Sequence, residues 1–162
     1  RETISLSMAF ELEKLKSNEA EAFVALFDDL KLGLNKQREI LSLAYEISKR
    51  ESLGIAEILQ AGEAKGILSN PNWDRNTKSH RLRRCLRKRR FPEICRAEGK
   101  FRERKQRLNL GPRADLIPPK NFEGNRYRLI FDFTNLTELK AHHKAMTRIG
   151  SDPDLSKILS RE

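Results

Sequence analysis

Arginine dominates the chemistry available to this chain, and most of it lies in one stretch. Residues 75–107 hold 15 Lys and Arg residues and three acids, a net charge of +12, and Arg outnumbers Lys there by 11 to 4. The planar fork of N–H donors on arginine matches phosphate oxygens and guanine edges. This stretch therefore indicates contact with a large anion.

The rest of the chain shows that this charge is concentrated rather than spread. The 162 residues carry a net charge of +10, so those outside residues 75–107 have a net charge of −2. A run of mixed charges is usually a solvated helix surface, but here the signs are segregated. We predict nucleic acid, with DNA first, as the partner of the following cations: Lys78, Arg81, Arg83, Arg84, Arg87, Lys88, Arg89, Arg90, Arg96, Lys100 and Arg107.

Residue spacings typical of catalysis are missing. The sequence has no phosphate-binding glycine loop, no nucleophile elbow and no paired cysteines at metal-ligand spacing. His142 and His143 are adjacent, so they point to different sides of a helix, and we expect His143 to be partly buried and His142 exposed. We therefore expect no enzymatic activity, cofactor, metal ion or small-molecule substrate.

The two cysteines, Cys85 and Cys95, are too few for a disulfide framework and indicate a reducing cytoplasm. No apolar run reaches the length of a membrane span, and no signal peptide is visible. Because the chain opens with Arg1, we interpret it as a piece of a longer protein. The expected location is the cytoplasm, in association with the nucleoid.

The elements that must position these residues are mostly α-helices. Apolar residues recur at helical spacing over residues 5–108, and Gly111, Pro112, Pro118 and Pro119 then mark a linker. We predict a helical, basic, nucleic-acid-binding region over residues 1–110. A small α+β module, a β-hairpin with helices, should follow over residues 111–162.

Two consecutive helices, at residues 76–90 and from Pro92 to about 108, should hold the charge. In the first, Leu82, Cys85 and Leu86 share one face. Its opposite face should present His80, Arg83, Arg84, Arg87 and Lys88 to solvent. In the second helix an apolar stripe lies opposite three cations, so each helix can pack by one side; the stripe is Ile94, Ala97, Phe101 and Leu108, and the cations are Arg96, Lys100 and Arg107.

The C-terminal module changes period. Alternating residues over 127–133 predict a strand, paired through a turn at residues 121–125 with the segment around Leu116–Ile117. The following helix has a predicted apolar stripe of Leu136, Leu139, His143, Met146 and Ile149. Since a lone hairpin is marginal and leaves a free edge, we expect a homodimer. Its predicted interface is Tyr127, Leu129, Phe131, Phe133, Leu139 and Met146; the alternative is a monomer whose edge is covered within the chain.

Three aromatic residues invite a second interpretation. Trp73, Phe91 and Tyr127 could stack on unpaired bases. Only Trp73 and Phe91 border the basic stretch, so packing in a core or interface is the favoured role for each.

Two segments resemble the ParB family of chromosome- and plasmid-partitioning proteins. Residues 127–140, YRLIFDFTNLTELK, are similar to the family's C-terminal dimerisation module, in which a strand leads into a helix with a Glu-Leu pair near its start, here Glu138-Leu139. The segment from Thr3, TISLSMA, is similar to the stretch directly after the family's helix-turn-helix. The nucleotide-handling GERR-like motif is absent. The resemblance implies a dimeric DNA-binding partition or regulatory protein.

Other partners stay open. An interaction scaffold that holds an acidic protein partner is the alternative from a different class, and RNA binding is a third. An anionic membrane surface fits less well, because an aromatic-rich apolar face for insertion is lacking. We expect weak sequence specificity from these residues alone, since phosphate contacts explain the charge.

Overall fold

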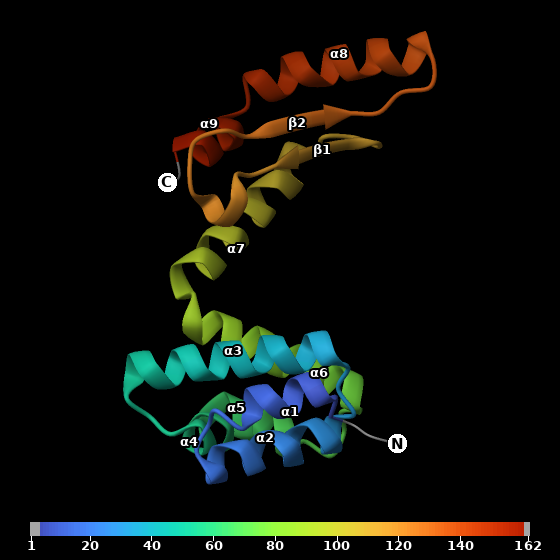
Figure 1. Ribbon diagram of the computed structural model, residues 1–162. Coiled ribbons are helices and arrows are strands. Elements are labelled where there is room, and N and C mark those ends of the chain that lie inside the picture. The colour runs from blue at the N-terminus through green and yellow to red at the C-terminus, as the bar shows by residue number, and fades with distance from the viewer. Residues whose placement is uncertain (1–3, 161–162) are drawn as a thin grey trace. The chain divides into compact units, whose positions relative to one another are not determined.

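The computed structural model describes residues 4–160, and the chain divides into two compact units after Pro92 (Figure 1). Within the described residues the first unit is helical, and the second joins a two-stranded sheet to helices. The predicted class, mostly α with a small strand–helix module, is confirmed. The predicted boundary at residues 110–111 differs from the observed division, because the second basic helix shares a core with the hairpin.

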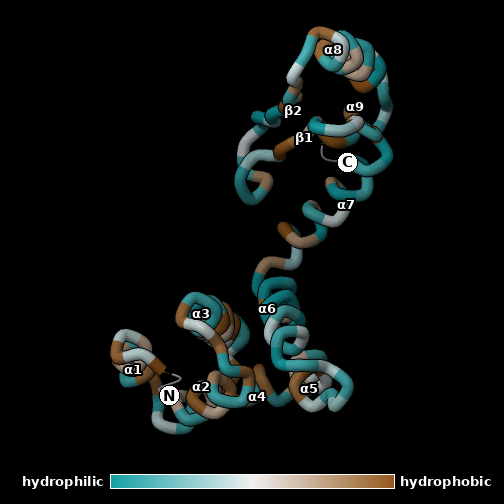
Figure 2. Tube along the Cα trace, turned by 90° about the vertical axis from the view of Figure 1, so that its right-hand side faces the viewer, coloured by the Kyte–Doolittle hydropathy of each residue, from teal (hydrophilic) through white to brown (hydrophobic). Residues whose placement is uncertain are grey.

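The described residues of the first unit form six helices. The helices are α1 (Leu6–Leu12), α2 (Ser17–Leu30), α3 (Leu34–Glu51), α4 (Ile55–Gln60), α5 (Gly62–Ser69) and α6 (Arg75–Arg90). Their apolar stripes meet in one core that includes the fully buried Phe23, Phe27, Ile40, Ile47 and Leu82. In Figure 2 hydrophobic and hydrophilic residues alternate along α2 and α3, whereas α6 is largely hydrophilic.

The basic helix α6 has clear start and stop signals. The Asp74 carboxylate accepts a 2.7 Å hydrogen bond from the Thr77 backbone N–H and so caps the N-terminus. The helix ends at Phe91, which precedes Pro92 and leaves helical geometry. Four cations occupy the last turn, where the helix dipole favours positive charge. The predicted helix at residues 76–90 is thus confirmed.

The second unit is built on α7 (Pro92–Leu108) and an antiparallel hairpin, with Pro92 itself assigned to the first unit. Strand β1 (Ala114–Ile117) pairs with β2 (Arg128–Phe131), and Leu116 lies opposite Leu129. This is the predicted pairing. The connection contains the short 3-10 helix η1 (Lys120–Phe122), and α8 (Leu136–Gly150) and α9 (Pro153–Ser160) follow. The second core consists of Leu108, Leu110, Leu116, Ile149 and Ile158.

Helix α8 is rotated relative to the prediction. His142 is buried and His143 is exposed, the reverse of the expected assignment. The ring of His142 lies 5.0 Å from that of Phe131, and its Nε2–H donates to the Asp132 carbonyl at 3.0 Å. The hairpin thus packs against the face of α8 that carries His142, Ala145 and Ile149. These residues are spaced three and four positions apart, so they lie on one side of the helix.

That rotation corrects the predicted apolar stripe as well. Ile149 is buried, but Leu136, Leu139 and Met146 are 64%, 40% and 57% exposed. These side chains lie on a flank of α8 that the hairpin does not cover. The pattern of apolar residues alone could not distinguish a flank that packs from one that stays open.

Leu82 ties α6 to the first core, so its truncation should loosen the platform that holds the cations. Leu82→Ala removes a fully buried side chain, and we expect a loss of about 2–5 kcal/mol in the free energy of unfolding. Val24→Ala, at a side chain 42% exposed in the same unit, should cost under about 1 kcal/mol. Urea unfolding monitored by circular dichroism measures both, and equal losses would contradict this packing.

Candidate nucleic-acid interface

Helix α6 carries nine Lys and Arg residues and no acid, and six of them form two groups on different faces. One group flanks the apolar stripe and reaches α3, which packs beside α6. The other group projects away from the core. We call them the inner arginines, Arg83, Arg89 and Arg90, and the outer row, Arg81, Arg84 and Lys88.

The inner arginines pair with carboxylates of α3. Arg83 Nε lies 2.8 Å from Glu39 Oε2, and Arg90 Nε lies 2.6 Å from Glu46 Oε2. Both pairs span seven residues on each helix, so α3 and α6 run side by side in the same direction. Arg83 was predicted to share the solvent face of the helix. It is instead half-buried against α3, because a long side chain at the border of the stripe can reach a neighbouring helix.

The C-terminal ends of the two helices are tied together by a denser network. Arg50 of α3 donates to the carbonyls of Arg89 and Arg90 at 2.6 and 2.8 Å, so it satisfies orphan acceptors at the end of α6. Glu51 accepts from Arg89 at 2.5 Å and from Arg50 at 2.7 Å. Hydrogen bonds from Arg89 and Arg50 lower the pKa of the Glu51 carboxyl below its ordinary value. These charges connect the C-terminal ends of α3 and α6.

The outer row faces solvent. Arg81, Arg84 and Lys88 are exposed and are spaced three and four residues apart, so they line one side of the helix. The row extends over about 10 Å. The Arg81 guanidinium lies 4.0 Å from the centroid of the Trp73 ring, which restrains the side chain by a cation–π contact. Lys78 and Arg87 are both half-buried, on the flanks of the helix.

The predicted cations of the second unit also differ in their contacts. Arg107 is held by Asp154 at 2.8 Å, and Arg96 lies 2.8 Å from the exposed carboxylate of Glu93. Lys100 is exposed. These three cations belong to the second unit, whereas the outer row belongs to the first.

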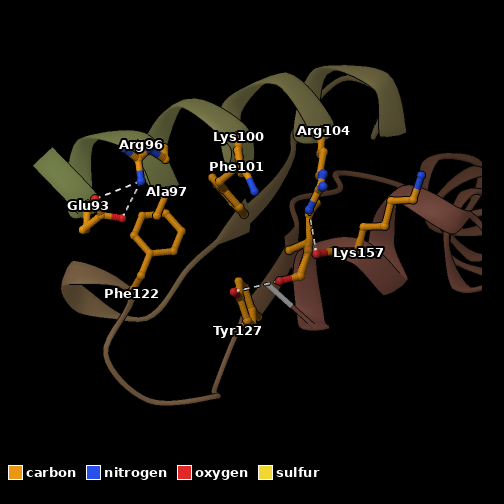
Figure 3. A pocket seen from close by; sticks show the side chains of 10 residues that line it. Glu93, Arg96, Ala97, Lys100, Phe101, Arg104, Phe122, Tyr127 and Lys157 are labelled. Atoms are coloured by element: carbon orange, nitrogen blue, oxygen red, sulfur yellow. Dashed lines mark hydrogen bonds and ion pairs between the residues drawn. The ribbon is translucent and has the colours of Figure 1, made fainter. Parts of the chain in front are cut away.

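A cleft of about 180 Å³ opens in the second unit beside Lys100 (Figure 3). Lys100, Phe101 and Arg104 project into it from α7, and Phe122 and Tyr127 face them from the other wall. Of the three aromatic residues noted in the sequence, Tyr127 belongs to this cleft. Trp73 and Phe91 are partly buried against the first core, which matches their favoured packing role.

The residues predicted for dimerisation fall into two groups. Tyr127, Leu129 and Phe131 are half-buried, the first two against the core of their own unit and Phe131 beside His142. Phe133, Leu139 and Met146 are 51%, 40% and 57% exposed. Together with Leu136, these three form an open apolar flank along and just before α8.

Residues for other chemistry are sparse within residues 4–160. No group of three or more His, Cys, Asp and Glu side chains in this range is arranged to hold a metal ion. Cys85 and Cys95 are free thiols, and burial raises the pKa of Cys85, which keeps it protonated at neutral pH. Every helix in the described range is too short or too polar to cross a lipid bilayer.

Comparison with known proteins identifies no relative. The chain matches no protein-family model, no curated protein and no solved structure. The resemblance to the ParB family therefore stays a prediction from the sequence. Thr3, at which one of its two segments begins, lies outside the described residues.

The network at Glu51 generates a pH-dependent prediction. Its depressed pKa means that the stabilisation is present above the ordinary value of 4.5 and is lost as the pH falls through the lower value in the folded chain. Glu51→Gln should reduce the free energy of unfolding at pH 7 by about 1 kcal/mol. The difference from the parent chain should shrink below pH 4. Urea unfolding at pH 7 and pH 3 tests this, with the exposed Glu13→Gln as control; a pH-independent difference would contradict it.

Proposed function

We propose that this chain is a DNA-binding module that contacts the phosphate backbone through the outer row of α6. The observation that carries the proposal is the sorting of charge on this helix. The inner arginines are committed to α3, whereas Arg81, Arg84 and Lys88 face solvent on a helix without a single acid.

Electrostatics supports a polyanion as the ligand. Three cations along one side of a rigid helix repel each other, and phosphates would relieve that repulsion while releasing their counterions. The helix is fixed by a packed core and a cap, so little backbone order has to be gained on binding. Sequence discrimination should be weak, because phosphate contacts position a protein without reading bases.

The biological setting that we propose is partition or regulation of DNA, as the ParB resemblance implies. Two features of the second unit support it. Strand β2 leads through a short turn into α8, and Glu138 and Leu139 lie in the first turn of that helix. Glu138 closes the turn by accepting from the Thr134 backbone N–H at 2.7 Å and from the Arg113 guanidinium at 3.0 Å.

The same module supports a homodimer. The open flank contains four exposed apolar side chains, those of Phe133, Leu136, Leu139 and Met146, and Phe133 follows shortly after the hairpin. The two-stranded sheet of the described residues also leaves each strand one unpaired edge. A second copy related by a two-fold axis could cover both features, since such an interface is self-complementary.

The outer row should determine DNA affinity. We expect the triple variant Arg81→Ala, Arg84→Ala, Lys88→Ala to bind a random duplex more weakly than the parent chain. Loss of three phosphate contacts should flatten the log–log salt dependence by about 2–3 units. Fluorescence anisotropy at several salt concentrations measures both effects.

A matched control separates position from net charge. Lys14→Ala, Lys49→Ala, Lys65→Ala removes three exposed cations from the same unit and should change the slope little. Equal effects of the two triples would overturn the assignment to α6. Titration with RNA of the same length and with polyglutamate tests the alternatives, and tighter binding to polyglutamate would favour the scaffold for an acidic protein partner.

If the chain forms a homodimer, its mass in solution should be well above that of one chain. Sedimentation at micromolar concentration should show a species near twice 18.8 kDa. Met146→Asp should give monomers, because a carboxylate in a closed apolar interface is strongly destabilising. Leu159→Asp, at an exposed apolar residue of α9, serves as control and should stay dimeric. A single species of 18.8 kDa for the parent chain would reject the dimer.

A further inference from the structure

The cleft in the second unit combines aromatic walls with a cationic rim. Phe101 lies between two other rings, with centroids 5.7 Å from Phe122 and 6.3 Å from Tyr127. Cations stand around it at Arg96, Lys100, Arg104 and Lys157, against a single carboxylate, that of Glu93. A site that serves only the core would not need cations on its rim.

The walls are held in place by specific contacts. The Tyr127 hydroxyl donates to the Ile158 carbonyl at 3.0 Å, and Arg104 Nη1 donates to the Lys157 carbonyl at 2.7 Å (Figure 3). Both bonds tie α9 to the cleft. The shape of the site is therefore set before any ligand arrives.

Phe122 reaches the cleft through an unfavourable backbone conformation. Asn121 and Phe122 both have positive φ, 53° and 60°, in the left-handed region that bulky residues avoid. Strain of this kind is retained where the surrounding structure requires a particular side-chain position, and it clusters at functional sites. Here its result is an aromatic ring set edge-on against Phe101 in the wall of the cleft.

We propose that this cleft binds one nucleotide, with the base against Phe101, Phe122 and Tyr127 and the phosphate at Lys100 and its neighbouring cations. The volume of about 180 Å³ is below the roughly 300–1,000 Å³ of sites for larger ligands, so it accommodates one ring system at a time. Aromatic faces stack on any base, and cations beside them fix the phosphate.

The charges around the cleft suit an exchangeable anion. The Glu93–Arg96 pair is exposed on both sides, so it is weak and a phosphate can take the place of the carboxylate. Arg96, Lys100 and Arg104 follow one another at intervals of four residues, about 6 Å along α7. A single strand could continue along this row after its base enters the cleft. The ligand is thus a free nucleotide or an unpaired nucleotide of a strand, and it does not depend on duplex binding by α6.

The experiment uses the full chain with the outer-row triple variant as background, so that α6 contributes little. Three probes are used. The first is a fluorescein-labelled thymidine oligonucleotide, the second is the same oligonucleotide with every second base removed, and the third is thymidine monophosphate. Phe122→Ala should weaken binding of the thymidine oligonucleotide about tenfold and affect the abasic one much less. Lys100→Gln should weaken both.

Controls keep folding and net charge apart from binding. Lys144→Gln removes an exposed cation of the same unit and should leave all affinities unchanged, and circular dichroism checks that each variant is folded. If Phe122→Ala prevents folding, Lys100→Gln against Lys144→Gln decides the matter. Competition by thymidine monophosphate identifies a free nucleotide as sufficient, and binding of the oligonucleotide alone identifies a strand. If the background variant binds the thymidine oligonucleotide with the same affinity with and without Phe122→Ala or Lys100→Gln, the proposal is overturned.

Discussion

The first unit depends on the burial of a helix that carries nine positive charges and no negative one. Leu82 and Leu86 of α6 are fully buried, so the helix has to lie against the core although its cations repel each other. Helix α3 resolves this conflict, because Glu39, Glu46 and Glu51 meet the arginines that border the apolar stripe. Arg50 adds donors for the carbonyls at the end of α6. Helix α6 thus packs against the core by the same contacts with α3 that neutralise part of its charge.

This requirement also decides which charges are available to a partner. An arginine whose guanidinium already holds a carboxylate in a half-buried pair gains little from a phosphate, because the pair has to be broken first. Exposed cations far from α3 have no such cost. The proposed binding surface is therefore much smaller than the basic stretch in the sequence, but it rests on a helix that the core holds rigid.

In the second unit some cations are also paired with carboxylates of neighbouring elements. This unit leaves a row of apolar side chains on one helix uncovered. Arg107 is engaged by Asp154 and Lys105 by Asp115, which join α7 to α9 and to β1. Four other cations, Arg96, Lys100, Arg104 and Lys157, stand around an aromatic cleft. At the same time α8 packs by His142, Ala145 and Ile149, and leaves Leu139 and Met146 uncovered. Two different surfaces, one cationic and aromatic and one apolar, thus arise from a module of about seventy residues.

Elements with local sequence signals could be predicted from the residues alone. Helical periodicity, the break at Phe91–Pro92 and the alternation over residues 127–133 were enough to predict α6, α7 and the hairpin, because caps, proline and side-chain period act within a few residues. The pairing of the arginines and the covered side of α8 could not be predicted in this way. Those outcomes depend on partners 38 to 44 residues away along the chain for the inner arginines, and on the hairpin for His142. The matching seven-residue spacings, Glu39–Glu46 and Arg83–Arg90, were visible in the sequence, but they acquire meaning only once α3 and α6 lie side by side. Helix period states which residues share a face, whereas the neighbour against which that face packs is a property of the whole fold.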